Sequence, residues 1–205
     1  MIERLAAVTK TDVSRETYER LAAYAELLIA ENRRQNLVAR STIASLWERH
    51  IIDSAQLVPL MSGRQTLDIG SGAGLPGVVL AILSQGPITL VEPRRLRVEF
   101  LRSCVEKLGI RNATVVQGKA ERLSGRFDAI TARAVAPIGD LFASAIHLSH
   151  PGTIWVLPKG GRGQLELADA RDAWQGRFRM EPSATEGEAV IVVASNVSAK
   201  RKGRG

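Results

Sequence analysis

The chain has 205 residues, of which 45% are hydrophobic and 24% are charged, and its formal net charge at pH 7 is +7. This length favours one domain with a sizeable core over the two domains that nicotinamide-dependent dehydrogenases usually need. The single cysteine, Cys104, excludes an internal disulfide, and no segment resembles a secretory signal or is apolar enough to span a membrane. We therefore expect a cytoplasmic protein, and its positive charge favours a polyanionic partner.

Residues 1–62 predict a helical extension at the start of the domain. Apolar side chains recur at helical spacing over 14–35 and again over 41–60. Within the second stretch, His50 and Asp53 are three positions apart and share a helix face. A metal site needs more ligands than these two, so we interpret them as a structural pair and expect no bound metal.

The rest of the chain alternates between strand-like and helical patterns. Strands are predicted at 65–69, 88–92, 113–117, 127–131 and 153–158, and helices at 76–85, 94–109, 137–149 and 162–175. This alternation predicts a Rossmann-like α/β fold, a doubly wound and mostly parallel sheet with helices on both faces. Two further strands, at 178–182 and 189–194, are close enough in sequence to form an antiparallel pair at the sheet edge. The predicted core spans 63–196, and 197–205 is predicted to be a basic disordered tail.

The most informative segment is LDIGSGAGLPG at 67–77, in which an apolar strand runs through glycines into a helix. Glycine allows the backbone to adopt positive φ angles and to approach a ligand closely. The backbone N–H groups and the start of the following helix then point toward whatever binds at the turn. We interpret the segment as a cofactor-binding loop.

The glycines fit two cofactor patterns at once. The spacing GxGxxG at 72–77 is typical of dinucleotide binding, whereas DxGxGxG at 68–74 is typical of methyltransferases that use S-adenosylmethionine. Glu92 ends the next strand, 20 residues after Gly72, where a carboxylate accepts hydrogen bonds from ribose hydroxyls in either class. Because the chain has no room for a second catalytic domain, we expect S-adenosylmethionine rather than NAD.

The loops after the third and fourth strands open at the same edge of the sheet as the glycine loop. After the third strand, Ala120 and Glu121 are suited to frame an adenine ring; alternatively, Glu121 is a first-turn residue that the helix dipole favours. After the fourth strand comes Arg133, which is suited to hold cofactor and acceptor in line. The alternative for Arg133 is a structural ion pair with Asp68 or Glu92.

The residues present also narrow the acceptor chemistry. Enzymes that methylate an exocyclic amine commonly carry an Asn/Asp-Pro-Pro-aromatic motif after the fourth strand, and this chain has none there. Enzymes that methylate a pyrimidine carbon need a cysteine nucleophile, whereas Cys104 falls on the apolar stripe of a predicted helix. An acceptor that is already nucleophilic, such as guanine N7, needs only alignment with the methyl group and exclusion of water.

Several segments between residues 18 and 194 resemble one known family. They are RHIIDS at 49–54, LDIGSGAGLPGVVLAI at 67–82, VEPRRLRVEFL at 91–101, GKAE at 118–121, ITARAVAP at 130–137 and LPKG at 157–160. The family is the bacterial methyltransferase G of small-subunit ribosomal RNA, also called glucose-inhibited division protein B. The resemblance implies methyl transfer from S-adenosylmethionine to N7 of a guanine in 16S ribosomal RNA, directly and without a covalent intermediate.

The resemblance also implies cofactor contacts by position. These fall on Gly70, Leu75, Ala120, Glu121 and Arg133, and the motifs above add Asp68, Gly72 and Glu92. Arg133 is the candidate for positioning the acceptor. The candidate RNA contacts are Arg94, Arg95, Lys159, Lys200 and Arg201.

We expect a monomer whose partner is 16S ribosomal RNA or the small ribosomal subunit. Two other interpretations stay open at this point. A methyltransferase of small molecules typically carries a larger apolar lid over its acceptor, whereas only 4% of these residues are aromatic. An RNA-binding assembly factor with the same fold would bind ribosomal RNA without transferring a methyl group.

Overall fold

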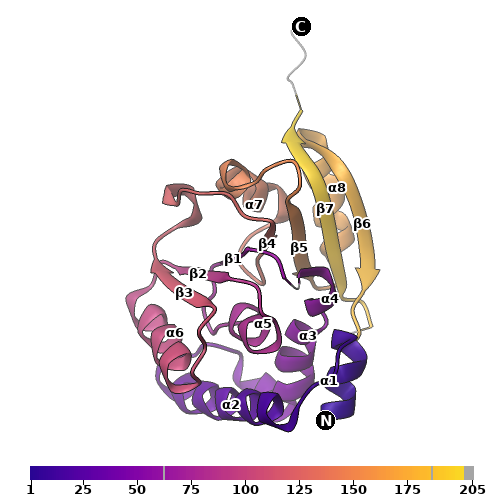
Figure 1. Cartoon of the computed structure of the whole chain (residues 1–205). Coiled ribbons are helices and arrows are strands. Elements are labelled where there is room, and N and C mark those ends of the chain that lie inside the picture. The colour runs from indigo at the N-terminus through magenta and orange to yellow at the C-terminus, as the bar shows by residue number, and fades with distance from the viewer. Residues whose placement is uncertain (62, 186, 201–205) are drawn as a thin grey trace, which may run out of the picture.

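The computed structural model describes residues 1–61, 63–185 and 187–200. They form a seven-stranded sheet with the strand order β3-β2-β1-β4-β5-β7-β6 (Figure 1). The strands are β1 (Thr66–Ile69), β2 (Ile88–Glu92), β3 (Ala113–Gln117), β4 (Ala129–Thr131), β5 (Ile154–Lys159), β6 (Trp174–Pro182) and β7 (Val190–Ala199). The strands β1 to β5 pair in parallel, and β7 pairs antiparallel with both β5 and β6. The predicted fold class and the antiparallel edge pair are confirmed.

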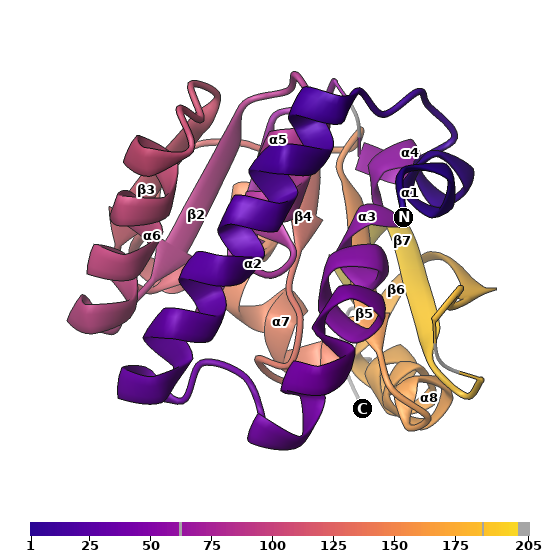
Figure 2. The same cartoon turned by 90° about the horizontal axis from the view of Figure 1, so that it is seen from below.

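Helices cover both faces of the sheet. They are α1 (Ile2–Thr9), α2 (Arg15–Gln35), η1 (Arg40–Ser45), η2 (Trp47–Ile52), α3 (Asp53–Ala55), α4 (Val58–Met61), α5 (Gly77–Leu83), α6 (Arg95–Lys107), η3 (Ala120–Arg122), α7 (Ile138–Ala145), η4 (Ile146–Leu148) and α8 (Gly163–Ala173). One face carries α5 and α6 with α2 lying across them, and the other carries α7 and α8 (Figures 1 and 2). In the described ranges, no helix combines the length and apolar character needed to cross a membrane.

Two apolar cores result, one on each face of the sheet. Successive residues of a strand point to opposite faces, so Leu90 belongs to the core under α2, α5 and α6, and Val91 to the core under α7 and α8. All of Thr66–Ile69 is buried because β1 lies in the middle of the sheet. The strand order reverses between β1 and β4, and the carboxyl ends of these strands therefore open into a crevice that positions the site.

The N-terminal region is helical where the pattern predicts it. The helix expected over 14–35 is α2, whereas the helical stretch expected over 41–60 is divided into a 3-10 turn, a π-helical segment and two short α-helices. Pro59 has no N–H to donate to the carbonyl four residues earlier, which interrupts the helix before α4. The sequence pattern also does not predict the helix α1, although Leu5 is completely buried.

The C-terminal hairpin is longer than predicted. β6 begins at Trp174, whose ring packs edge-on against Phe142 at 5.5 Å between centroids. β7 continues to Ala199, and the N–H of Lys200 donates to the carbonyl of Ala173 at 2.8 Å. The prediction of a disordered tail from residue 197 is therefore wrong for 197–199, and its last part, 201–205, lies outside the described residues.

Candidate cofactor and acceptor site

The glycine loop between β1 and α5 is held in the conformation that glycine favours. Gly70, Gly72 and Gly74 have φ angles of 66°, 52° and 89°. The loop is clamped from α2, where the buried hydroxyl of Tyr24 donates to the carbonyl of Ala73 at 2.7 Å. Sequence reasoning missed Tyr24, because no local pattern joins a residue of the first long helix to this loop.

Asp68 lies beneath the glycine loop and is only 1% exposed. Its Oδ2 accepts a hydrogen bond from the N–H of Gly77 at 3.2 Å, and its Oδ1 has no hydrogen-bond partner among the described residues. Burial raises the pKa of this carboxyl from 3.8 to about 7. The side chain thus fixes the start of α5 against the end of β1.

Glu92 reaches the same loop from the end of β2. Its Oε2 accepts from the N–H of Gly72 at 3.0 Å, and its Oε1 accepts from the N–H of Arg94 at 2.8 Å. Arg97 Nη1 lies 3.9 Å from Oε2. A carboxylate oxygen has two lone pairs, so each oxygen keeps one acceptor position after these backbone hydrogen bonds.

A cavity of about 420 Å³ opens over these groups. Four of the predicted cofactor residues line it, namely Gly70, Glu92, Ala120 and Glu121. Leu75, within the loop, is 5% exposed and belongs to the core under α2, α5 and α6, and neither Leu75 nor Asp68 lines the cavity. We call this space the cofactor cavity.

A second cavity of about 510 Å³ lies beside the first, and we call it the acceptor cavity. Ala134, Val135 and Ala136 line both cavities, and we call these three residues the partition segment. Ala134 has a φ of 55°, which is rare for a residue with a side chain. The side chain of Val135 lies directly over Gly70, where a Cβ atom added to that glycine would come within 2.8 Å of it.

Arg133 lines the acceptor cavity and not the cofactor cavity. Its Nη1 donates to Oδ2 of Asp53 at 2.8 Å, and its Nη2 donates to Nδ1 of His50 at 2.7 Å. The alternative of an ion pair with Asp68 or Glu92 is therefore wrong. The two helical residues interpreted as a structural pair share one guanidinium instead.

The contact with Arg133 determines the tautomer of His50. An arginine can only donate, so Nδ1 must accept, and the ring proton lies on Nε2, 2.8 Å from Oγ1 of Thr42. Desolvation, followed by the charges of Arg133 and Arg49, lowers the pKa of His50 from 6.5 to about 4. The imidazole is therefore neutral at pH 7.

Asp53 also connects the site to the turn between β6 and β7. Its Oδ1 accepts from Nε2 of Gln56 at 2.9 Å and from Oγ1 of Thr185 at 3.0 Å. The N–H of Ala184 in turn donates to Oε1 of Gln56 at 2.7 Å. Three parts of the chain that are far apart in sequence thus meet around one carboxylate.

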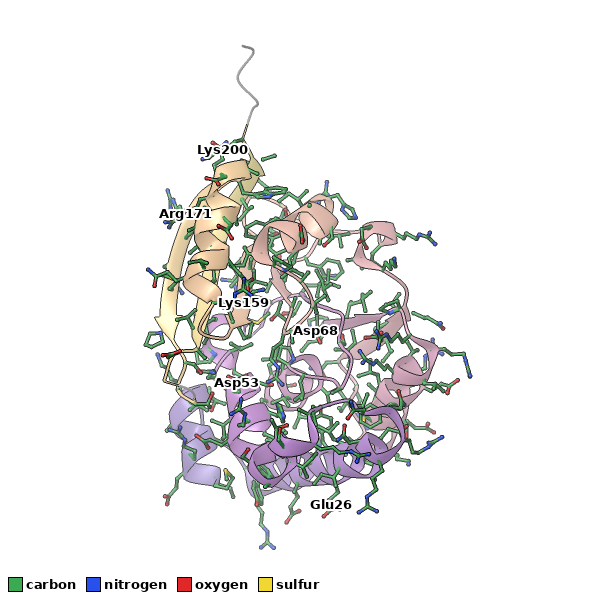
Figure 3. All side chains as sticks on the ribbon, turned by 180° about the vertical axis from the view of Figure 1, so that it is seen from behind. Glu26, Asp53, Asp68, Lys159, Arg171 and Lys200 are labelled. Carbon is green, nitrogen blue, oxygen red and sulfur yellow. The ribbon has the colours of Figure 1, made fainter. Side chains whose placement is uncertain are left out.

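The candidate RNA contacts fall in different surroundings. Arg94 is exposed and lines the cofactor cavity, whereas Arg95 is exposed on α6 and forms an ion pair with Glu99. The Lys159 side chain is only 8% exposed, with Nζ 2.7 Å from the carbonyl oxygen of Ala136 and 2.9 Å from Glu166. Lys200 is exposed and lies well away from Asp53 and Asp68 (Figure 3), whereas Arg201 lies outside the described residues.

Two further observations concern a cysteine nucleophile and a bound metal. Cys104 is completely buried, and burial raises the pKa of its thiol to about 12, which confirms the interpretation of this residue as packing. Within 1–61, 63–185 and 187–200, no group of three or more His, Cys, Asp or Glu side chains could hold a metal ion.

Comparison with known proteins identifies the family of the chain. A family model described as rRNA small subunit methyltransferase G matches residues 17–188. The chain belongs to this family. A protein of Zymomonas mobilis named ribosomal RNA small subunit methyltransferase G is 45% identical, with 94% of this chain and 92% of the relative covered. A protein of the same name from Rhizorhabdus wittichii is also 45% identical, with 94% and 91% covered.

Solved structures are similar in fold at low sequence identity. A putative O-methyltransferase from Klebsiella pneumoniae is 16% identical, with a TM-score of 0.58 over 84% of this chain and 90% of that one. A SAM-dependent methyltransferase from Aquifex aeolicus is 16% identical, with a TM-score of 0.56 over 74% and 92%. Together with the family match, these structures confirm the predicted methyltransferase fold.

Proposed function

We propose that the chain transfers the methyl group of S-adenosylmethionine to N7 of a guanine in 16S ribosomal RNA, by direct in-line displacement. The observation that carries the proposal is the meeting of two cavities at the partition segment, with the glycine loop on one side and Arg133 on the other. Because the two cavities share these three residues in their lining, a cofactor and an acceptor base that occupy them lie next to each other beside the segment. Membership of the family supports ribosomal RNA as the acceptor.

The residues of the cofactor cavity fit S-adenosylmethionine. Glu92 keeps one acceptor position on each oxygen for the ribose hydroxyls, and the small buried side chain of Ala120 leaves room for a flat ring. The Oδ1 of Asp68, under the loop, has no hydrogen-bond partner among the described residues. When bound, the cofactor supplies a methyl group on a sulfonium sulfur, and the sulfur keeps the electron pair of the broken bond.

The acceptor cavity contains groups that bind and orient a base rather than groups that remove a proton. Guanine N7 has a lone pair and no proton to lose, so no general base is needed. The guanidinium of Arg133 has five N–H bonds, and hydrogen bonds to Asp53, His50 and the carbonyl of Arg49 leave others to donate to guanine O6, beside N7. Because Arg133 is held on two sides, it positions the base without reorganisation during the reaction.

The proposal includes a monomer that acts in the cytoplasm on 16S ribosomal RNA, either free or in the small subunit. Exposed Arg94, which lines the cofactor cavity, and the exposed Arg95 that follows it in the chain are the candidates for contact with phosphates on the RNA that carries the guanine. Light scattering of the purified protein, alone and with RNA, measures the oligomeric state.

The test is incubation with labelled S-adenosylmethionine and 16S ribosomal RNA or small subunits, followed by digestion and mass spectrometry of the nucleosides. We expect 7-methylguanosine, and no labelled product when RNA is replaced by small-molecule extract. Label in small molecules alone would support the small-molecule enzyme. Tight RNA binding with no label transferred, under conditions in which the cofactor binds, would support the assembly factor.

A further inference from the structure

The partition segment needs support from the rest of the molecule. Ala134 is in the left-handed region of backbone conformation, and the side chain of Val135 is 44% exposed. An exposed segment with a strained residue keeps its position only when surrounding groups hold it. The structure shows such groups at both ends.

At the first end, the preceding residue Arg133 is anchored to Asp53 and His50. At the other end, Nζ of Lys159 donates to the carbonyl of Ala136 at 2.7 Å. Lys159 is the last residue of β5, so its backbone belongs to the central sheet. The segment is therefore joined to the helical extension on one side and to the sheet on the other.

The surroundings of Lys159 favour a role inside the protein. Its ammonium forms an ion pair with Glu166 of α8 at 2.9 Å, and the two side chains are 8% and 26% exposed. A partly buried ammonium with a carboxylate and a carbonyl as partners has little left to offer a phosphate on the RNA surface. This differs from Arg94, which is exposed.

We propose that Lys159 is a positioning residue for methyl transfer, which holds the partition segment through the carbonyl of Ala136 and is itself held by Glu166. The inference rests on the proposed function and replaces the prediction that Lys159 contacts RNA. In-line transfer depends on the alignment of two bound molecules, and a displacement of about 1 Å can cost a hundredfold in rate. Lys159 therefore acts on the rate of transfer and not on the affinity for RNA.

The test compares Lys159→Met, Lys159→Arg and Glu166→Gln with the wild type. Lys107→Met is the matched control, since it makes the same change at an exposed lysine at the end of α6. The measurements are kcat and KM with 16S ribosomal RNA, the dissociation constant for S-adenosylmethionine, and RNA affinity over a range of salt concentrations. Wild-type turnover is established first, because its absence would defeat the proposed function and not this inference.

We expect Lys159→Met to lower kcat by about tenfold to a hundredfold. Its KM for RNA and the salt dependence of RNA binding should match those of the wild type. Lys159→Arg, which still has donors for Ala136 and Glu166, should recover most of the rate. The kcat of Glu166→Gln should lie between those of Lys159→Met and Lys159→Arg. Lys107→Met should have normal kcat.

Two results would overturn the proposal. One is normal kcat for Lys159→Met with a log–log salt slope of RNA binding reduced by roughly 0.7–0.9, which is the signature of one phosphate contact fewer. The other is normal kcat with no change in slope. If Lys159→Met fails to fold, Glu166→Gln is the deciding variant. We then expect a lower kcat with an unchanged salt slope of RNA binding, and normal turnover of Glu166→Gln would overturn the inference.

Discussion

The two sides of the partition segment differ in how the chain builds them. The cofactor cavity is formed by the ends of β1, β2 and β3 with the loops that follow them, together with the partition segment and α7. Its shape depends on hydrogen bonds donated by the backbone, such as that from the Gly72 N–H to the Glu92 carboxylate. The acceptor cavity combines side chains from the helical extension, from the loop after β4, and from β5 and α8. One side is therefore made by local motifs and the other by side-chain pairs between distant segments.

This difference predicts that substitution of a single side chain lowers turnover more at the acceptor cavity than at the cofactor cavity. We expect Arg133→Ala to lower methyl transfer by about a hundredfold or more at saturating cofactor and RNA, since under the proposed function it removes the group that orients the base. Arg133→Lys should recover little, because one ammonium cannot replace the planar fork between Asp53 and His50.

Single-turnover kinetics with labelled cofactor measure this effect. Arg126→Ala, at an exposed arginine just before β4, is the control and should have normal turnover. Near-normal transfer by Arg133→Ala would show that the acceptor side does not depend on this residue.

On the cofactor side, the largest effect is expected at Glu92. Glu92→Ala removes the acceptors for ribose and the partner of Gly72 N–H, and it should weaken S-adenosylmethionine binding by about 1–3 kcal/mol. Calorimetric titration measures the change, with NAD as the competing ligand for the wild type. Tighter binding of NAD than of S-adenosylmethionine would contradict the assignment of this cavity.

The same difference explains why the sequence predicts the residues of the cofactor cavity better than those of the acceptor cavity. The glycine loop and Glu92 are recognisable because their residues are close together and their spacing reflects one turn from a strand into a helix. The grouping of Asp53, Arg133 and Thr185 around one ion pair could not be predicted, since nothing local relates a helix, a strand end and a hairpin turn. For the same reason the sequence suggests an RNA contact at Lys159, whose carboxylate partner is on another element.

The sheet was predictable in strand number and direction, and so was the long helix α2, whereas α1 and the division of the second helical stretch were not. Helical periodicity over 41–60 is real, but Pro59 and side-chain hydrogen bonds such as Ser54 Oγ to the carbonyl of His50 divide it into short pieces. A periodic pattern reports the buried face of a segment and not the continuity of its backbone hydrogen bonds.

A further prediction concerns the charge beneath the glycine loop. The folded-state pKa of Asp68, about 7, is above its ordinary value of 3.8, so its contribution to stability is present below pH 3.8 and is lost as the pH rises through 7. Asp68→Asn keeps an acceptor for Gly77 N–H without the buried charge. It should raise the free energy of unfolding at pH 8 on the order of 2 kcal/mol, with a smaller gain at pH 5.

Urea unfolding at the two pH values checks this expectation. Asp128 is the control of opposite sign, because hydrogen bonds from the Gln65 N–H and from His150 lower its pKa. Asp128→Asn should therefore lose more stability at pH 8 than at low pH. Equal stability of Asp68→Asn and the wild type at both pH values would mean that burial does not raise the pKa of the Asp68 carboxyl.

The smallest effect is expected for the basic end of the chain. Deletion of residues 201–205 removes three positive charges and leaves β7 and the hydrogen bond from Lys200 to Ala173 in place. If these charges contact phosphates, the log–log salt slope of RNA binding should fall by roughly 0.7–0.9 for each phosphate that the shortened chain no longer neutralises. Affinity for S-adenosylmethionine should not change, and an unchanged slope would exclude phosphate binding by this segment.

The separation of cofactor binding from acceptor positioning is tested most directly by calorimetric titration of S-adenosylmethionine into Arg133→Ala. Since Arg133 lines the acceptor cavity and bonds to Asp53 and His50, the dissociation constant should stay close to the wild-type value even though methyl transfer falls by about a hundredfold or more. A decrease in cofactor affinity as large as that of Glu92→Ala would place Arg133 on the cofactor and contradict the separation of the two cavities.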